Sequence, residues 1–494
     1  MNSRVFNPID LEIIGLVYRF SKKRKRKLYL VGGFLRDILL RRSRDNPDLD
    51  FCLKTNAISF GRVLAKDTGS NFVVLDKEHG ACRLIKKIDN RTYTLDFTDF
   101  RGADLEEDLR HRDFTFNTIA LSLEEFFTLH REKRGKLTFN DLDKLLIDPY
   151  EGRKDLNLKL IKVADKSAFV EDPLRILRSF SFSCLLGFKI DRETLKLAKL
   201  HKKKLSTVSW ERIREELFKI LTVPKSFDCM IQMDEGKILK VIFPEIEKMR
   251  GLWQGPYHHL DVWKHSLETL KNLETISEDF KDNQEIRGYL KEFIAGEHSR
   301  LALLKLGALF HDIGKPGALR REKGKLIFHG HERIGAAITQ NIARRLKLSN
   351  IETNTLKTMI FWHLRPGYLA DNEVLTTRAI FRFFRDTNTE ALSVLLLSLA
   401  DQRATRGRLT TPDSRLRHER LVSKLIKEYF RRKKEKKMPR LINGHDLIKE
   451  FKLEPSPVIG KILSEVEEMQ AIGKIKTKKE ALQAAVKFLK IKAQ

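Results

Sequence analysis

The segment YLVGGFLRDILLRRSRDNPDLDF, residues 29–51, constrains the fold more than any other part of the chain. An apolar strand-like run leads into two glycines and an amphipathic helix, and a second strand-like run then brings Asp48 and Asp50 one residue apart. Side chains alternate between the two faces of a strand, so both carboxylates point to one side while Leu49 points into the core. We therefore expect a strand–turn–helix–strand unit within an α/β region, with two carboxylates beside the glycine turn.

This arrangement has the properties of a triphosphate site. Two close carboxylates repel one another unless a cation lies between them, and oxygen ligands suit Mg²⁺, which also binds phosphate oxygens. Gly32 and Gly33 let the backbone approach a ligand, and the helix that follows offers free N–H groups and a positive dipole end. Arg36, one turn into that helix, adds positive charge. The segment predicts magnesium-dependent phosphoryl chemistry with Asp48 and Asp50 as catalytic metal ligands, and the competing motifs GxxxxGK[ST] and GxGxxG are absent.

The charge balance indicates a polyanionic partner. Lysine and arginine number 96 against 67 aspartates and glutamates, a formal net charge of +29. Such an excess favours nucleic acid or an anionic membrane surface. No apolar run approaches the roughly 20 residues of a membrane span, and the first residues do not form a signal-peptide pattern; we expect a cytoplasmic protein without a membrane segment. The cysteines show no CxxC pairing and predict neither disulfides nor a zinc knuckle: Cys52, Cys82, Cys184 and Cys229.

Strand-like and helical stretches alternate through residues 1–165, whereas helical spacing dominates from there onward. Residues 277–300 are polar and predict a surface excursion. Residues 429–440 are charged and contain a proline, which predicts a linker. A chain of 494 residues is too long for one core, so several domains are expected.

A second segment, EEDLRHRDFTFNTIAL at 106–121, supplies Arg112 and Asp113 ahead of a predicted helix. With this segment the chain resembles the polymerase-beta-like nucleotidyltransferases, and within them the class II group of bacterial CCA-adding tRNA nucleotidyltransferases and poly(A) polymerases. The resemblance runs over almost the whole chain, through GGxxRD, DxD, an RRD-type stretch that is His-Arg-Asp here, IDPYEGRKDL, EDPLRILR and VIFPEI.

The resemblance implies roles for several residues of the first two segments. It implies that Asp48 and Asp50 bind Mg²⁺ and that Gly33, Arg36 and Arg112 contact the nucleotide. For the third carboxylate of the site it leaves two candidates, Asp113 and Asp96.

The stretch EDPLRILRSF has two readings. Asp172 and Pro173 are a good helix N-cap and first helical residue, which explains them without any ligand. The resemblance instead implies that Asp172 and Arg175 read the Watson–Crick edge of the incoming base, with Arg178 beside them. A carboxylate accepts hydrogen bonds and a guanidinium donates them, so this pair matches cytosine and adenine and leaves uracil and guanine unpaired. Many members carry another arginine at the position of Ser181, and no role is carried to that residue.

The expected products depend on a short connection. Only RGADL, residues 101–105, separates the strand-like YTLDFTDF from the RRD-type stretch, where CCA-adding relatives hold a longer loop. The short connection favours an enzyme that adds only the two cytidines, which would need a separate A-adding enzyme acting on its product. Full CCA addition from CTP and ATP stays open, as do a poly(A) polymerase and a hydrolase with an inactive transferase head.

A second constellation resembles the HD metal-dependent phosphohydrolases. DVWKHSLETL, LALLKLGALFHDIGK, FHGHERIGA, WHLRP and LLLSLADQRATRG carry it. The implied metal ligands are His265, His311, Asp312 and Asp401, with His331 and His363 for a second ion. Mixed imidazole and carboxylate ligands favour Mn²⁺, Fe²⁺, Ni²⁺ or Mg²⁺ over tetrahedral zinc. We expect hydrolysis of phosphate monoesters or cyclic phosphodiesters at tRNA ends.

The predicted fold is α+β. The expected parts are a nucleotidyltransferase head with a mixed sheet at 1–165, a helical neck that binds RNA and carries EDxxR at 166–250, an HD domain at 251–430, and a basic linker with a small helical tRNA-binding domain at 431–494. His445 and Asp446 form another His-Asp pair, but no matching helices surround them, so they predict a turn or cap.

Overall fold

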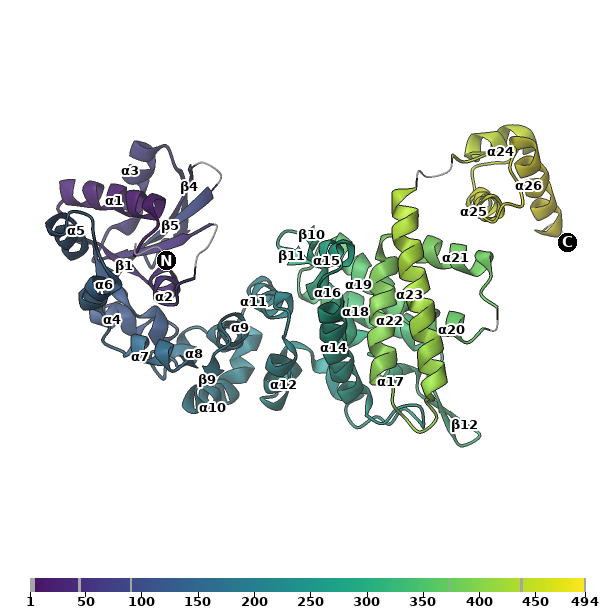
Figure 1. Cartoon of the computed structure of the whole chain (residues 1–494), viewed down its shortest axis with the longest axis horizontal. Helices are drawn as coiled ribbons and strands as arrows, with labels where there is room; N and C mark the ends of the chain where they lie inside the picture. The colour runs from purple at the N-terminus through teal and green to yellow at the C-terminus, as the bar shows by residue number, and fades with distance from the viewer. Residues whose placement is uncertain (1–4, 43–45, 89–90, 373, 436–438, 493–494) are drawn as a thin grey trace. The chain divides into compact units, whose positions relative to one another are not determined.

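The computed structural model describes residues 5–42, 46–88, 91–372, 374–435 and 439–492. Part of the basic run at 41–44 and part of the expected linker lie outside these ranges. The chain divides into two compact units, the first formed by Met1–Glu216 with Glu235–Val241 and the second by Leu217–Asp234 with Ile242–Gln494. Figure 1 labels their elements. Among the described residues, no helix has the length and apolar character needed to cross a bilayer.

The first unit contains a seven-stranded sheet in the order β3-β4-β5-β2-β1-β6-β7. Its strands are β1 (Tyr29–Val31), β2 (Asp48–Leu53), β3 (Asn71–Asp76), β4 (Ala81–Ile88), β5 (Arg91–Asp99), β6 (Ala120–Ser122) and β7 (Leu146–Ile147). β2 and β5 run parallel and the other neighbours run antiparallel, so the sheet is mixed, as predicted.

The centre of this sheet brings the two predicted carboxylates to the glycine turn. Residue Asp50 on β2 pairs with Val31 on β1 and with Asp96 on β5. Leu49, between the carboxylates, is fully buried, and the buried Phe51 ring stacks on Phe97. The alternating pattern of β2 therefore fixes which face carries the carboxylates.

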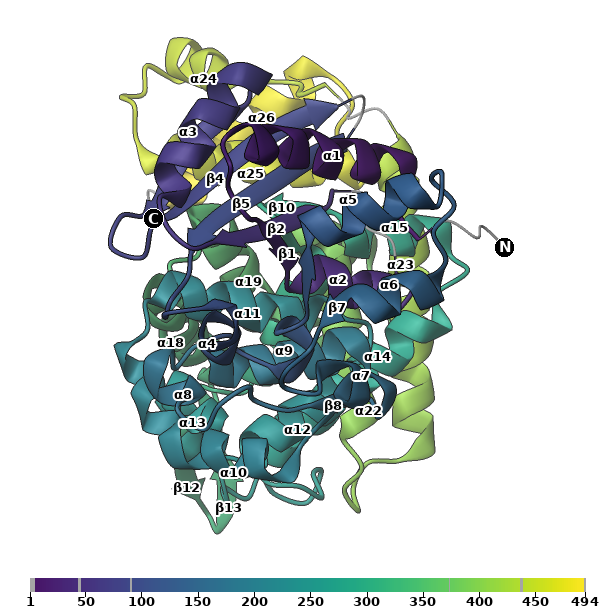
Figure 2. The same cartoon turned by 90° about the vertical axis from the view of Figure 1, so that its left-hand side faces the viewer.

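Helices cover the sheet and continue the first unit. The helices α1 (Pro8–Lys23) and α3 (Ala57–Thr68) lie over the strands in Figure 2. The further elements of the unit are α2 (Gly33–Leu39), α4 (Leu105–Arg110), α5 (Leu123–Glu132), α6 (Phe139–Leu145), α7 (Gly152–Asn157), β8 (Leu160–Ile161), α8 (Ala168–Glu171), α9 (Arg175–Leu186), β9 (Lys189–Ile190), α10 (Arg192–His201), most of α11 (Trp210–Thr222) and most of α13 (Ile238–Ile242). Short 3₁₀ turns occupy Thr115–Asn117 and Lys202–Thr207.

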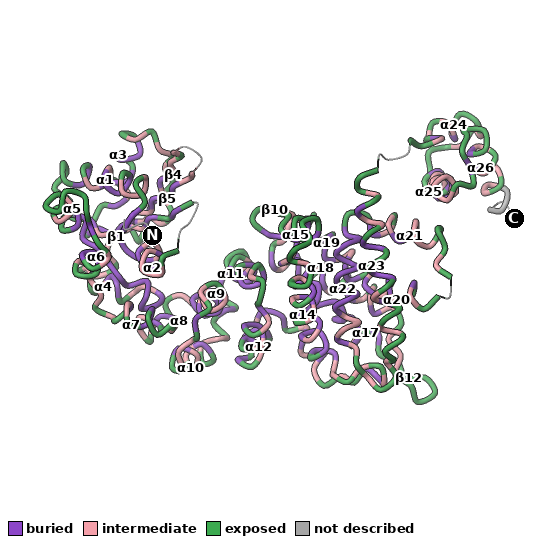
Figure 3. The backbone as a smooth tube through the Cα atoms, in the orientation of Figure 1, coloured by how far each residue is buried: buried purple, intermediate pink, exposed green. Residues whose placement is uncertain are grey.

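The second unit is almost entirely helical. Its elements are α12 (Phe227–Glu235), a 3₁₀ turn at Pro244–Met249, α14 (Val262–Asp279), α15 (Gln284–Lys291), β10 (Phe293–Ala295), β11 (His298–Ser299), α16 (Arg300–Phe310), α17 (Lys315–Ala318), β12 (Arg320–Glu322), β13 (Lys325–Ile327), α18 (His331–Arg345), α19 (Asn350–Trp362), α20 (Arg365–Ala370), α21 (Thr377–Thr387), a 3₁₀ turn at Asn388–Glu390, α22 (Ala391–Ala404) and α23 (Pro412–Lys434). Figure 3 shows buried residues concentrated in α14, α16 and α22. The predicted α+β class is confirmed.

Two local expectations for this unit were wrong. The polar stretch 277–300 is not a surface excursion, because α15 buries Ile286, Tyr289 and Leu290. The expected linker is helical through Lys434, where α23 ends. Polar composition concealed an amphipathic helix in the first case and a charged helix end in the second.

The C-terminal residues form three helices around a small core. They are α24 (Gly444–Phe451), α25 (Pro457–Ala471) and α26 (Lys478–Lys492). Ile442, Leu447 and Ile462 are buried between them. Asp446 accepts a hydrogen bond from the backbone N–H of Asn443 in a capping box, so the expected cap at His445-Asp446 is confirmed.

Candidate functional site

The glycine turn lies directly against the Asp50 carboxylate. Gly32 has φ +78°, which favours glycine, and a Cβ built there would lie 3.2 Å from Asp50 Oδ2 and 3.4 Å from Arg112 Nη1. Asp48 is exposed on the same face of β2. The predicted carboxylate pair, the turn and Arg112 are therefore together in one place.

The electrostatics of this edge fit a bound cation. Burial raises the pKa of Asp50 to about 6, with the Arg112 charge opposing and the neighbouring Asp96 and Asp48 carboxylates adding to the rise. A divalent ion beside these oxygens would favour the charged carboxylate and offset both the burial and the repulsion that raise the pKa. Oxygen-only donors of this kind fit Mg²⁺.

The two candidates for the third carboxylate have different surroundings. Asp96 lies opposite Asp50 on the adjacent strand, and Arg83 donates to both of its oxygens at 2.8 Å. Asp113 forms an ion pair with Arg178, 2.7 Å apart, and accepts from Asn117 Nδ2 at 2.8 Å. Burial alone would raise the Asp113 pKa, but Arg178 and these hydrogen bonds hold it below its ordinary value. Asp113 thus joins α9 to the segment after α4, whereas Asp96 lies on the strand that pairs with β2.

Arg36 is held by neighbouring protein groups. Its guanidinium is buried, donates from Nε to Asp37 at 2.9 Å and from Nη1 to Asn117 Oδ1 at 2.9 Å, and lies 5.1 Å from the Phe182 ring centroid. Arg36 therefore fixes α2 against the segment that carries Arg112 and Asp113. The sequence pattern alone does not separate this structural role from a phosphate contact.

The segment IDPYEGRKDL packs against Thr115, in the segment that carries Arg112 and Asp113. The Asp148 carboxylate accepts from the backbone N–H groups of Gly152 and Arg153 at 2.7 and 3.0 Å. A Cβ on Gly152 would lie 2.2 Å from the Thr115 carbonyl oxygen, so only glycine permits this close approach. Asp155 accepts from the Thr115 hydroxyl at 2.7 Å.

The EDxxR residues line a polar cavity of about 810 Å³ within the first unit. Asp172 Oδ2 accepts from Arg212 Nη2 at 2.7 Å, and Oδ1 accepts from the Leu174 N–H at 3.2 Å. Asp172 therefore caps the turn before α9 and also presents a carboxylate to the cavity. Arg175 is buried and donates to the His111 and Ala168 carbonyls at 2.6 and 3.3 Å.

Sequence reasoning missed Arg212 of α11, which lines the cavity and donates a hydrogen bond to Asp172. The sequence signal was its place in WERIREEL, an amphipathic helix with an arginine one turn from a buried glutamate. That glutamate, Glu216, accepts from the Ser181 hydroxyl at 2.5 Å. Ser181 is thus a buried residue that hydrogen-bonds to α11.

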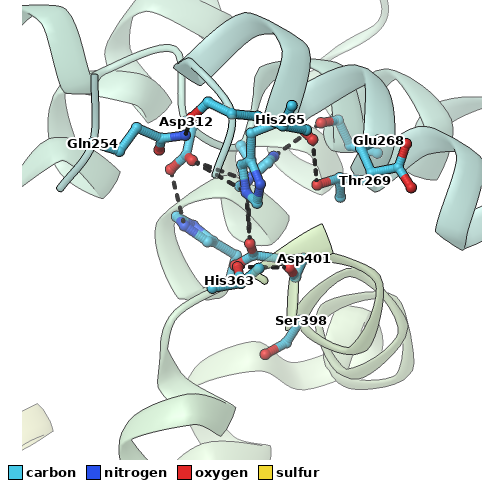
Figure 4. A network of polar contacts seen from close by, with 12 residues as sticks. Gln254, His265, Glu268, Thr269, Asp312, His363, Ser398 and Asp401 are labelled. Carbon is cyan, nitrogen blue, oxygen red and sulfur yellow. Dashed lines mark hydrogen bonds and ion pairs between the residues drawn. The ribbon is translucent and has the colours of Figure 1, made fainter. Parts of the chain in front are cut away.

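The second unit gathers all six predicted HD ligands, and Figure 4 shows four of them, His265, Asp312, His363 and Asp401. They form two groups, and within each group the ligand atoms lie within 4.8 Å of one another. One group is His265, His311 and Asp401, and the other is Asp312, His331 and His363. Asp312 reaches both groups, with Oδ2 3.2 Å from His311 Nε2 and Oδ1 3.2 Å from His331 Nε2. The arrangement can hold two ions bridged by one carboxylate.

Backbone contacts orient three of the imidazoles. His311, His331 and His363 each place Nδ1 within 2.7–2.9 Å of the carbonyl three residues earlier. Their Nε2 atoms are buried without a hydrogen-bond partner among the described residues. Such a hydrogen bond fixes the tautomer and directs the other nitrogen to a metal. Inward-facing nitrogen atoms without partners are the observation that fits a metal centre.

Charges at this cluster also fit a cation. Burial alone would lower the pKa of His311, but the neighbouring Asp312 and Asp401 carboxylates raise it to about 10. These carboxylates therefore favour a positive charge beside them, as a metal ion would supply. Burial and the neighbouring histidines lower the pKa of His363 to about 3, which leaves a neutral imidazole suited to coordination.

Three further residues that the sequence did not single out contact this centre. Lys315 Nζ lies 2.7 Å from Asp312 Oδ2 and donates to Gln254 Oε1 at 2.6 Å. The His258 ring packs edge-on against His265, with centroids 4.7 Å apart. The spacing of Lys315 three residues after Asp312 was the available signal; Gln254 and His258 come from an irregular segment without periodicity.

Comparison with known proteins agrees with both sites. Family models match the poly A polymerase head domain at residues 28–162, the RNA and SrmB-binding site of polymerase A at 187–249, the HD domain at 262–406 and the tRNA nucleotidyltransferase domain 2 at 336–486. The chain is 30% identical over 455 residues to an A-adding tRNA nucleotidyltransferase of Deinococcus radiodurans, covering 90% of this chain and 91% of the relative. The chain belongs to the tRNA nucleotidyltransferase and poly(A) polymerase family.

Another relative, a CC-adding tRNA nucleotidyltransferase of Geobacter sulfurreducens, is 28% identical over 65% of this chain and 68% of the relative. The Thermotoga maritima CCA-adding enzyme, solved in complex with tRNA, shares the fold with a TM-score of 0.62 at 21% identity, covering 98% and 96% of the two chains. Enzymes of the nucleotidyltransferase and HD families typically use divalent metals, which agrees with the ligand groups found here.

Proposed function

We propose that this protein is a template-independent nucleotidyltransferase that extends the 3′ end of tRNA, with CTP and ATP as the candidate nucleotides, in the cytoplasm. The observation that carries the proposal is the register that places Asp48, Asp50 and Asp96 on adjacent parallel strands beside the Gly32 turn. Similarity to A-adding and CC-adding relatives supports the choice of tRNA as substrate.

The chemistry follows from this edge of the sheet. Asp48 and Asp50, with Asp96 rather than Asp113 as the third carboxylate, would hold Mg²⁺, which would neutralise charge on the α-phosphate and lower the pKa of the RNA hydroxyl. The 3′ oxygen forms a bond to the α-phosphorus while the bond to the β-phosphate oxygen breaks and pyrophosphate leaves. Arg112 beside Gly32 stabilises the added negative charge, and the glycines admit the triphosphate.

Base selection belongs to the Asp172 cavity. A carboxylate has about four lone-pair positions, so Asp172 can accept from a base amino group while it keeps Arg212 and Leu174. Arg175, held by two carbonyls, supplies the donor for the ring nitrogen. We propose that Arg178 maintains the head–neck connection through Asp113 instead of touching the base.

Within this activity we propose addition of cytidine alone. The connection after β5 is short and internally bonded: the Ala103 N–H donates to Glu107 Oε2 at 2.8 Å, and the Arg101 N–H donates to Asp108 Oδ1 at 3.1 Å. A short connection held by these hydrogen bonds has little freedom to move. We therefore do not expect it to change the shape of the cavity so that the site switches from C addition to A addition. The product would then need a separate A-adding enzyme.

One set of assays separates the alternatives. tRNA transcripts that lack CCA, end in C or end in CC are each supplied with one nucleotide at a time, and product lengths are read on a gel. Extension by two cytidines and no extension of the CC-ended transcript supports the proposal. Addition of one A to the CC-ended transcript indicates an A-adding enzyme, CCA from mixed nucleotides indicates full addition, and long A tails indicate a poly(A) polymerase. No incorporation alongside an active hydrolase site would indicate an inactive head.

The HD cluster supports a second activity. Two ligand groups bridged by Asp312, with Lys315 beside it, could bind Mn²⁺, Ni²⁺, Fe²⁺ or Mg²⁺ and activate a water molecule. We propose that this site removes phosphate or opens cyclic phosphate at damaged tRNA ends, restoring the hydroxyl that the transferase uses. Cyclic-phosphate-ended tRNA with the Mn²⁺- or Ni²⁺-loaded protein tests this. Absence of phosphate release and of ring opening would contradict it.

A further inference from the structure

Helix α23 (Pro412–Lys434) separates apolar and basic residues onto different faces. Its inward face buries Leu421, Val422, Leu425, Ile426 and Phe430. The outward positions are five exposed cations spaced three or four residues apart, Arg417, Arg420, Lys424, Lys427 and Arg431. At a rise of about 1.5 Å per residue this stripe extends roughly 20 Å along one side of the helix.

Four of these cations line a groove. The groove has a volume of about 630 Å³, and Ile380 of α21 and Leu416 of α23 contribute apolar surface to it. Its basic lining residues are Arg420, Lys424, Lys427 and Arg431. The stripe therefore borders an open groove to which α21 contributes one apolar residue.

The two acidic residues of the groove pair with Arg403, with Arg432 and with Arg431, the last residue of the stripe. Glu419 accepts from Arg403 at 3.2 Å. Glu428 accepts from Arg431 and Arg432 at 2.7 Å, and these hydrogen bonds lower its pKa to about 2 although partial burial opposes them. They leave little negative charge to balance the rest of the stripe.

The remaining cations are unbalanced. Within the part of the chain that the structure describes, Arg417, Arg420, Lys424 and Lys427 make no hydrogen bond or ion pair through their side chains. Like charges three and four residues apart destabilise a helix. An anionic partner would relieve this repulsion.

We propose that this groove binds the sugar–phosphate backbone of RNA. Side chains three and four residues apart are separated by about 4.5 to 6 Å along the axis, a spacing of the same order as that between successive phosphates of a strand. An open groove lined by cations has room for one strand of RNA along the helix. The inference rests on the proposed function for the identity of the RNA as tRNA, and it gives the second unit its own contact with that substrate.

The test is the double substitution Lys424→Glu and Lys427→Glu. Both side chains are exposed, so we expect the fold and melting temperature to stay parental. A tRNA transcript should bind roughly tenfold or more weakly near 0.1 M salt, and the slope of log K against log salt should fall by about 1.5 to 2, the number of lost phosphate contacts. Lys424→Gln with Lys427→Gln should give a smaller change in the same direction.

The matched control is Lys323→Glu with Lys325→Glu, two exposed lysines at the β12–β13 hairpin with the same change of net charge. We expect this control to change tRNA affinity less than twofold. Parental affinity and salt slope in the Lys424 and Lys427 variants, or an equal loss in the control, would overturn the proposal. A loss of binding to phosphatidylserine vesicles with tRNA binding intact would overturn it in favour of a membrane contact.

The outcome is separable from that of the proposed transferase. At saturating tRNA the groove variant should extend RNA at the parental rate, because the Asp48–Asp50 edge is untouched. If the parent protein incorporates no nucleotide at all, the transferase proposal fails while the difference in RNA binding between variant and control still decides the groove.

Discussion

The two candidate metal sites of this protein differ in how their side chains are held. At the HD cluster, three histidines are fixed by backbone carbonyls three residues earlier, and their Nε2 atoms lie 3.2 to 3.8 Å from the carboxylate oxygens of Asp312. At the Asp48–Asp50 edge of the sheet, Asp48 is exposed, Asp96 on the adjacent strand accepts from Arg83, and Arg36 donates to Asn117. A site for a small ion needs only ligand atoms that are fixed in position. A site that binds and releases a nucleotide and an RNA end needs side chains that can contact the substrate while they keep their protein partners.

The largest effect is expected at the transfer edge, which depends on few carboxylates. Asp50→Asn should reduce nucleotide incorporation on the order of 10³-fold, the equivalent of several kcal/mol of lost charge stabilisation. Phosphate release by the HD site should be unchanged in the same preparation. Both activities are measured on the same tRNA, by end-labelling and by phosphate release.

The same assay distinguishes the third carboxylate. We expect Asp96→Asn to impair incorporation nearly as much as Asp50→Asn, with little change in tRNA binding. Asp113→Asn should instead lower the melting temperature, because it leaves Arg178 without its partner. If Asp113→Asn alone abolishes incorporation while the fold stays intact, the assignment of Asp96 is wrong.

The reverse contrast is expected at the HD cluster. Asp312→Ala removes the carboxylate shared by both ligand groups, so we expect at least a 10²-fold loss of phosphate release and a loss of bound metal, measured by elemental analysis. Nucleotide incorporation should stay parental. Phosphate release by the variant at the parental rate would place the hydrolytic site elsewhere.

The parts that follow from sequence are those in which local pattern and chemistry coincide. The β1–α2–β2 unit was predictable because alternation fixed the faces of Asp48 and Asp50, and the six HD ligands were predicted because their motifs resemble those of the HD family. Asp113 was expected ahead of a helix, yet a 3₁₀ turn and β6 follow it. That strand is set by pairing with β1 across more than 80 residues of sequence, which no local pattern records.

Partners that decide a role also lay beyond local pattern. Arg36 matched a phosphate-binding motif, but its orientation depends on Asn117, far along the chain. Arg212 became visible only when α11 packed beside Asp172. Sequence spacing identified which residues carry charge, and tertiary contacts decided which of them face a ligand.

A moderate effect is expected at Asp172, whose carboxylate we expect to contact both Arg212 and the incoming base. Arg212→Ala removes the only arginine that contacts Asp172 among the described hydrogen bonds, so the carboxylate can rotate. We expect roughly a tenfold loss of discrimination between CTP and UTP, measured as the ratio of kcat/KM values. Arg212→Lys should restore part of it. Unchanged discrimination in the alanine variant would show that Leu174 and the fold alone orient Asp172.

The smallest effect concerns the packing that makes the HD cluster rigid. A Cβ on Gly314 would lie 2.0 Å from the His331 carbonyl oxygen and 2.5 Å from the Gly335 nitrogen, both on the backbone of α18. Gly314→Ala should therefore force α18 away from the His311-Asp312 turn and destabilise the second unit by about 1 to 3 kcal/mol. Gly288→Ala in α15, where a Cβ meets nothing within 4 Å, is the matched control and should be neutral or slightly stabilising. Thermal unfolding and metal content are measured for both. Equal melting temperatures with full metal content would mean that the cluster tolerates movement of α18, and the contrast in rigidity between the two sites would then not hold.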